Sequence, residues 1–94
     1  MQEIHHEQTG NRGSFFIEAG GRRLAELAYF APRYQPITIE HTEVSDELRG
    51  TGAGGRLVEA AVQFARAEGR KINPLCPFAK AVFDKTPAYQ DVLA

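Results

Sequence analysis

Four glycines lie within the six positions 50–55, in the stretch LRGTGAGG, and this stretch constrains the fold more than any other. A strand-like run ends just before it at Val44, and an amphipathic helix pattern begins directly after it. Glycine lets a backbone approach a ligand closely, and the first turn of a helix leaves unpaired N–H donors at the positive end of the helix dipole. A strand, a glycine loop and a helix N-terminus therefore predict a site for a phosphate or pyrophosphate. The alternative is a flexible surface turn.

The length and charge of the chain bound its class. A chain of 94 residues allows one domain, residues 1–94, with a single modest core. Its 11 Lys and Arg residues nearly balance 12 Asp and Glu residues, which argues against a nucleic-acid binder that works by bulk charge. No apolar run approaches the ~20 residues of a membrane span. We therefore expect a globular domain that contacts neither nucleic acid nor a membrane.

The cysteine count and the N-terminal residues bear on the compartment. Residues 1–6 lack the charged-then-apolar pattern of a signal peptide. The single cysteine, Cys76, leaves no internal disulfide, and a lone free thiol suits a reducing cytosol. We expect a cytoplasmic protein.

The first half of the sequence predicts four antiparallel strands in meander order. Turn residues at 9–13 and 19–21 separate the first three strands. Residues 23–30 also suit a helix by their Leu, Ala and Glu content, but their position between turn signals favours a strand. The predicted strands are residues 3–8, 14–18, 23–30 and 37–44.

Residues 37–44 form the most strand-like run in the chain. Strict alternation divides its side chains between two faces, with Ile37, Ile39, His41 and Glu43 on one and Thr38, Glu40, Thr42 and Val44 on the other. Neither face is purely apolar near the C-terminal end, so we expect this end to line a cleft.

The second half predicts a helix, a parallel strand and a helix. The helix at 54–68 carries an apolar stripe and ends before Gly69, and a strand at 70–75 returns parallel to 37–44. Pro77 suits the first position of a further helix, which places Cys76 at or next to its N-cap. The inward side chains of that helix are predicted to be Phe78, Ala79, Val82 and Phe83, and residues 88–93 form a short final turn. The fold class is α+β with a mixed sheet.

The glycine stretch matches two nucleotide-binding motifs only in part. Gly50-x-Gly52-x-x-Gly55 matches a dinucleotide fingerprint, but no acidic residue ends the next strand, and the upstream meander is wrong for a doubly wound sheet. The phosphate-loop pattern needs Gly-Lys-Ser/Thr, and here Arg56 follows the glycines.

The remaining pattern resembles a known family. Arg49-x-x-Gly52-x-Gly54, after a strand and before an amphipathic helix, resembles the acetyl-CoA pyrophosphate loop of the GNAT acetyltransferase superfamily. The strings HTEV at 41–44 and PLCPF at 74–78 resemble a subgroup of very small, stand-alone GNAT-like proteins. The resemblance implies a minimal GNAT-like fold with acetyl-CoA as its cofactor.

The resemblance also implies where the donor binds. The end of the strand at Val44 would pair through its main chain with the pantetheine arm, and the acetyl thioester would lie near Cys76. The pyrophosphate would be held by the backbone N–H groups of Arg49, Gly50, Thr51, Gly52, Ala53 and Gly54. Typical members carry one or two helices between the first two strands, and this chain has only a turn there. The acceptor side is therefore open, or a protein partner or second copy supplies it.

Cys76 has a chemical case of its own. A thiol at a helix N-terminus faces the positive end of the dipole, which favours the thiolate. A thiolate can take an acetyl group, and a thiol can protonate the departing CoA. The alternative is a small buried apolar residue.

Other polar residues are candidates for catalysis or binding. Glu43 and His41 lie on the strand that leads into the glycine loop, where a base could take a proton from an amine, or they are merely solvated. Asn73 binds the amides of the cofactor or satisfies the backbone at a strand end. Tyr89 is an acid candidate by the resemblance, with packing as its alternative. His5 and His6 point to opposite faces of a strand, so we expect no metal site.

Two functions remain open at this point, and a purely structural domain is a third possibility. The first is an acetyl-CoA-dependent acyltransferase that acetylates an amine, with Cys76 taking part. The second is a CoA or acyl-CoA binding module without turnover, which the missing acceptor-side helices favour.

Overall fold

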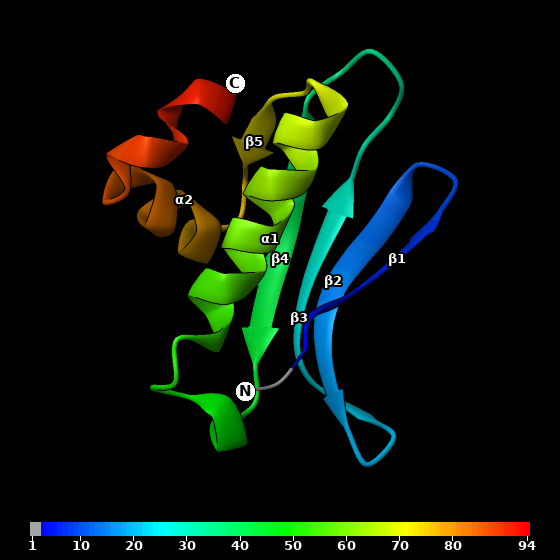
Figure 1. The fold of residues 1–94 in the computed structure, drawn as a ribbon, viewed down its shortest axis with the longest axis vertical. Helices are drawn as coiled ribbons and strands as arrows, with labels where there is room; N and C mark the ends of the chain where they lie inside the picture. Colours follow the sequence, from blue (N-terminus) through cyan, green and yellow to red (C-terminus); the bar gives the residue numbers. More distant parts are fainter. Residues whose placement is uncertain (1–2) are drawn as a thin grey trace.

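The computed structural model describes residues 3–94 and shows a five-stranded mixed sheet with helices packed on one face (Figure 1). The strands lie in the sheet in chain order: β1 (His5–Thr9), β2 (Arg12–Ala19), β3 (Arg22–Phe30), β4 (Ile37–Val44) and β5 (Ile72–Pro74). The first four pair antiparallel, and β5 pairs parallel with β4. The predicted meander followed by a parallel strand is confirmed.

The helical elements connect and cover the sheet. They are η1 (Asp46–Leu48), α1 (Ala53–Glu68), α2 (Pro77–Asp84) and η2 (Pro87–Val92). The crossover helix α1 packs on β2, β3 and β4, and α2 packs on β4, β5 and α1 (Figure 1). Gly69 ends α1 in a left-handed conformation with φ 67, as its place after the apolar stripe predicts. Among residues 3–94, no helix combines the length and the apolar character that crossing a membrane requires.

The core lies between the sheet and the helices. It is built by fully buried side chains of the sheet, among them Ile17, Leu27, Tyr29, Ile37 and Ile39, and of the helices, among them Leu57, Val58, Val62 and Phe83. The apolar stripe of α1 and the inward residues of the strands therefore meet as the sequence predicts.

The opposite face of the sheet has no helix over it in the described part of the chain. Arginines cover its aromatic rings instead: the guanidinium carbon of Arg23 lies 3.8 Å from the ring centroid of Phe16, and that of Arg12 lies 4.6 Å from that of Phe30. Phe16 is only 9% exposed as a result. Carboxylates hold the guanidinium of Arg23 in place, through ion pairs with Glu7 and Glu26. We call this surface the open face.

The alternation predicted for residues 37–44 is wrong in its second half. Tyr29 pairs with Ile39 and Ala28 pairs with His41, so a β-bulge leaves Glu40 as an extra residue. The bulge reverses the order of the faces beyond it. Thr42 and Val44 stand opposite the buried residues Leu27 and Ala25, and thus face the helices with Ile37 and Ile39. His41 and Glu43 face the open side.

Candidate functional site

The glycine loop joins η1 to α1 at the end of β4. Gly50 and Gly52 adopt φ of 78° and 84°, a left-handed region that costs other residues strain. Gly52 is the N-cap of α1, and no side chain caps this helix. The first-turn N–H groups of α1 have no partner within the helix and point out from its N-terminus. The loop therefore presents helix N-terminal donors at the position where the sequence predicts an anion site.

Two of the predicted donors are already used inside the loop. The Arg49 N–H donates to the Asp46 carbonyl at 3.3 Å, and the Thr51 N–H donates to the Leu48 carbonyl at 3.2 Å. The Thr51 hydroxyl donates to the same Leu48 carbonyl at 2.5 Å. The N–H groups of Arg49 and Thr51 are therefore occupied within the loop, whereas residues 53–55 lie in the first turn of α1, where N–H groups lack a partner within the helix.

A groove of about 610 Å³ runs from this loop to α2. One wall holds most of the residues that the sequence predicts to bind the acyl donor. The other wall is formed by Phe78, Val82 and Tyr89. The predicted residues that line it are Val44, Arg49, Gly50, Gly52, Ala53 and Gly54. Thr51 and Asn73 do not line it. Asn73 is exposed and pairs with Thr38, and its main-chain carbonyl accepts the Leu75 N–H in the turn that ends β5.

Phe78 lies in the groove, and the prediction that it faces the core is wrong. Its side chain is 42% exposed and its ring lies over Gly54. A Cβ at position 54 would lie 2.6 Å from Cζ of Phe78. Gly54 therefore lets the start of α2 approach the start of α1. The signal available in the sequence was a large apolar residue next to Pro77 in the first turn of a helix.

The strands β4 and β5 part beyond Ile39, and Cys76, which follows β5, does not line the groove. They pair only from Ile37 to Ile39, and β4 then continues through residues 40–44 with no further strand beside it among residues 3–94. The last link is the Cys76 N–H, which donates to the Ile39 carbonyl at 3.0 Å. This leaves an extended edge of β4 that leads from Cys76 to the glycine loop.

Cys76 occupies the predicted N-cap of α2. It is 5% exposed, and its Sγ lies 3.6 Å from Oγ1 of Thr42. The sequence does not single out Thr42, because strict alternation puts it on the face opposite to Ile39. The thiol thus lies on the helix side of β4, at the point where the strands part.

His41 and Glu43 lie on the other side of the same strand. His41 Nε2 is 4.0 Å from Glu43 Oε1, and both side chains are exposed. Glu43 stands directly opposite Glu26 on β3, and Arg23 pairs with Glu26 at 2.9 Å. The structure therefore separates the two candidate bases from the thiol by the thickness of β4.

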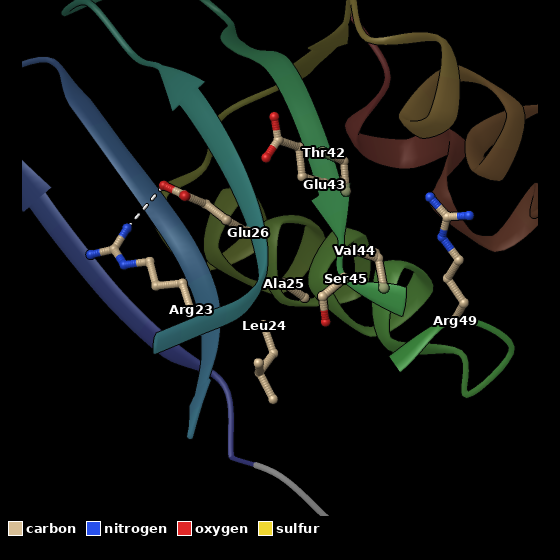
Figure 2. A pocket seen from close by; sticks show the side chains of 9 residues that line it. All are labelled: Arg23, Leu24, Ala25, Glu26, Thr42, Glu43, Val44, Ser45 and Arg49. Atoms are coloured by element: carbon tan, nitrogen blue, oxygen red, sulfur yellow. Dashed lines mark hydrogen bonds and ion pairs between the residues drawn. The ribbon is translucent and has the colours of Figure 1, made fainter. Parts of the chain in front are cut away.

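A second hollow of about 480 Å³ lies where β3 begins and β4 ends. Figure 2 shows the carboxylates of Glu26 and Glu43 on neighbouring strands, with Arg49 beyond the edge of β4. Val44 and Arg49 line both this hollow and the groove. The end of β4 is therefore exposed on two sides. The glycine loop lies on one side, and the carboxylates of Glu26 and Glu43 lie on the other.

Tyr89 borders the groove opposite the loop. Its ring packs edge-on against Phe83, with 5.7 Å between the centroids. Burial raises the pKa of the Tyr89 hydroxyl, and the nearby Glu59 charge acts in the same direction. The phenol therefore stays protonated at neutral pH and is a donor on the groove wall.

The histidines at the start of the chain point to opposite faces, as predicted. His5 stacks on Phe16 and His6 stacks on Phe15. Among residues 3–94, no three His, Cys, Asp or Glu side chains are placed to share a metal ion.

Residues 14–92 match the sequence model of the GCN5-related N-acetyl-transferase family. A curated relative, protein NATD1 of Xenopus tropicalis, is 28% identical over 88 residues, which cover 93% of this chain and 81% of that protein. Among solved structures, a GCN5-like protein from Staphylococcus aureus is 40% identical, with a TM-score of 0.75 over 99% of this chain and 88% of its own.

An IAA acetyltransferase from Bacillus cereus superposes with a TM-score of 0.60 at 21% identity. The match covers 80% of this chain and 53% of that one, so the likeness is one of fold. The family match extends over most of the sequence, and the groove, the glycine loop and the parted strands fit it. The chain therefore belongs to the GCN5-related N-acetyltransferase family, whose members carry out acyl-CoA-dependent acyl transfer.

Proposed function

We propose that the protein transfers an acetyl group from acetyl-CoA to an amine. The observation that carries this proposal is the unpaired edge of β4, residues 40–44, which connects the glycine loop to Cys76. Pyrophosphate would bind the first-turn N–H groups of α1, where the helix dipole favours an anion. The amides of the pantetheine arm would pair with the free edge of the strand, since both are extended. This puts the thioester beside Cys76.

The fit rests on features of the groove. Gly50 and Gly52 shape the loop by their left-handed backbone, and Gly54 lets Phe78 form the groove wall. Phe78, Val82 and Tyr89 give this wall apolar surface for the pantetheine arm. The chain therefore offers anion donors at one end and an apolar wall with an extended backbone at the other.

Cys76 is the proposed first acceptor. After the thiol gives its proton to water, the sulfur attacks the carbonyl carbon of the thioester. A carbon–sulfur bond to Cys76 forms as the bond to CoA breaks, and CoA leaves as a thiolate that takes a proton from water. An amine then attacks the acetyl-cysteine, and the Cys76 sulfur is the leaving group. Direct attack of the amine on acetyl-CoA is the alternative, and in it Cys76 is structural.

The amine would arrive around the end of β4, where the open face and the groove meet. Glu43 and His41 lie on the open face, and the carboxylate-lined hollow meets the groove at Val44 and Arg49. A carboxylate or imidazole at this position suits the removal of a proton from an ammonium acceptor. We propose Glu43 as this base, with His41 beside it.

A second candidate function is an acyl-CoA binding module without turnover. Only the turn between β1 and β2 fills the place of the acceptor-side helices, so no helix covers the open face in the described residues. A partner protein or a second copy would then complete the acceptor site. Both functions suit a cytoplasmic protein supplied with CoA.

Two measurements separate these functions. Acetyl-CoA at about 100 times its Kd should stabilise the fold by about 2.7 kcal/mol, which raises Tm by roughly 10 °C or more in a domain of this size. Release of free CoA in the presence of an amine panel, followed with a thiol reagent, reports turnover. Binding without release supports the module, and no melting shift contradicts both functions.

The role of Cys76 has its own test. Intact-protein mass after incubation with acetyl-CoA should show one acetyl group on the wild type and none on Cys76→Ala. If Cys76→Ala turns over at the wild-type rate and no adduct forms, the transfer is direct.

A further inference from the structure

A contact between sulfur and hydroxyl joins Cys76 to the neighbouring strand. Cys76 Sγ lies 3.6 Å from Thr42 Oγ1, which is a hydrogen-bonding distance for the larger sulfur atom. The Cys76 N–H donates to the Ile39 carbonyl at 3.0 Å and ties the start of α2 to β4. The thiol and the hydroxyl are thus held by backbone at both ends of the contact.

The β-bulge at Glu40 is what brings Thr42 to this position. Without the bulge, alternation would turn Thr42 to the open face, opposite to Ile39. With it, Thr42 stands across from the buried Leu27 and faces the helices. A threonine is stiff about χ1, and this one is half-buried, so its hydroxyl oxygen has a fixed place beside the sulfur.

A hydroxyl is suited to both protonation states of a thiol. It has two acceptor lone pairs and one proton, and the O–H bond rotates without moving the oxygen. It accepts the hydrogen bond of a neutral S–H group, and it donates to the sulfur once the thiol is ionised. A valine in the same place would offer neither, although its shape is almost the same.

We propose that Thr42 is a positioning residue for Cys76, whose hydroxyl holds the sulfur at the free edge of β4 as a thiol and as a thiolate. The purpose of this contact rests on the proposed function, since it sets the direction of the sulfur toward the thioester. The contact itself needs no acetyl-CoA, and its test can therefore stand apart from turnover.

The S–H stretching band in the Raman spectrum tests the contact directly. The chain has one cysteine, so this band reports only Cys76. Thr42→Val should move the band to higher wavenumber because the thiol loses its acceptor, and Thr42→Ser should keep the wild-type position. A band that does not move in Thr42→Val, or that moves equally in Thr42→Ser, overturns the proposal. Thr42→Ala gives the same readout if the valine variant fails to fold.

The rate of alkylation by iodoacetamide tests the ionised state. The thiolate loses a stronger hydrogen bond than the thiol does, and its greater nucleophilicity offsets part of this loss, so alkylation should slow by about two- to fourfold in Thr42→Val and stay close to the wild-type rate in Thr42→Ser. Equal rates in wild type and Thr42→Val contradict the thiolate contact. Thermal melting of each variant shows that the folded protein is compared.

The two proposals fail in different ways. A band shift in Thr42→Val together with full turnover of Cys76→Ala leaves the contact in place and removes its catalytic purpose. An unmoved band together with Cys76-dependent transfer leaves the proposed function and overturns the role of Thr42.

Discussion

His6 Nε2 and the Tyr29 hydroxyl lie 2.6 Å apart and link the edge strand β1 to the core. The imidazole of His6 also stacks on Phe15, with 4.1 Å between the centroids, and meets the edge of Phe64 at 4.8 Å. A neutral imidazole can accept the proton of the buried Tyr29 hydroxyl through Nε2. In an imidazolium both ring nitrogens carry protons, so the Tyr29 hydroxyl must turn to accept instead, and a charge then lies against the rings of Phe15 and Phe64. The attachment of β1 therefore depends on the charge of one histidine.

We predict that acid weakens the fold through His6. Burial lowers the pKa of His6 from its model-peptide value of 6.5. Between the two values the unfolded chain binds more protons than the folded one, so stability rises with pH in this window. The contribution of neutral His6 to the free energy of unfolding is fully present above pH 6.5. It is lost as the pH falls from 6.5 toward the lower pKa that His6 has in the folded protein. Urea denaturation midpoints from pH 8 to pH 5 measure the slope.

His6→Gln should flatten that slope, since glutamine keeps an acceptor for Tyr29 without titrating in this range. His5→Gln is the matched control, because it removes a histidine from the same strand without touching Tyr29. The pH dependence of stability in His5→Gln shows how much a histidine on β1 contributes when it has no contact with Tyr29. Equal slopes in the wild type and His6→Gln would falsify the assignment.

Gly13 should not tolerate a side chain, because Tyr29 fills the space above it. A Cβ at position 13 would lie 2.3 Å from the Tyr29 hydroxyl oxygen and 2.8 Å from the Glu7 carbonyl. Tyr29 is 1% exposed and has no room to move away. Gly13→Ala should destabilise the protein by about 1–3 kcal/mol, as overpacking does. Thermal and urea denaturation measure the change.

Gly55→Ala is the matched control for Gly13→Ala. An added Cβ at position 55 meets no atom within 4 Å, and the residue lies in the first turn of α1. The change should stabilise the helix by up to about 1 kcal/mol. Losses of similar size in both variants would show that the space around Tyr29 does not decide the cost at Gly13.

The elements of the fold follow from local patterns in the sequence. Glycine and proline signals mark the turns, and an apolar stripe marks α1, so the order of the strands and helices could be predicted. The face of the sheet to which each β4 side chain points beyond Ile39 could not be predicted. A single bulged residue, Glu40, reverses the faces, and no residue pattern in the strand marks it. Its register follows from pairing with β3, which is a property of the assembled sheet.

The candidate site was predictable in part for the same reason. The glycine loop and the N-cap position of Cys76 are local features, and both lie where the sequence predicts them. The contact of Thr42 with Cys76 and the ring of Phe78 over Gly54 join segments far apart in the chain. Such contacts depend on how α2 docks against β4 and α1, which periodicity does not specify.

Phe78 and Gly54 should be energetically coupled. In Gly54→Ala the new methyl group displaces the ring, which is partly exposed and able to swing away. In a Phe78→Ala background the same change meets no ring and keeps only the gain in helix propensity, up to about 1 kcal/mol. A double-mutant cycle on the free energy of unfolding should give a coupling of about 0.5–3 kcal/mol. Additive effects within about 0.3–0.5 kcal/mol would contradict the contact.

Glu43→Gln should lower turnover and leave the binding of acetyl-CoA unchanged. Glu43 lies on the open face of β4, opposite Glu26, while the donor groove lies on the helix side of the same strand. Loss of a general base costs about 10²–10⁴-fold in rate, and the loss should shrink at high pH, where the amine acceptor is already deprotonated. Initial rates of CoA release against pH, beside the melting shift with acetyl-CoA, measure the two effects separately. Glu18→Gln is the control, since Glu18 is an exposed carboxylate on β2, two strands from β4, and does not line the hollow that Glu43 lines. If the rate stays equally low at high pH, or falls equally in Glu18→Gln, Glu43 acts only through its negative charge on the surface and does not take the proton.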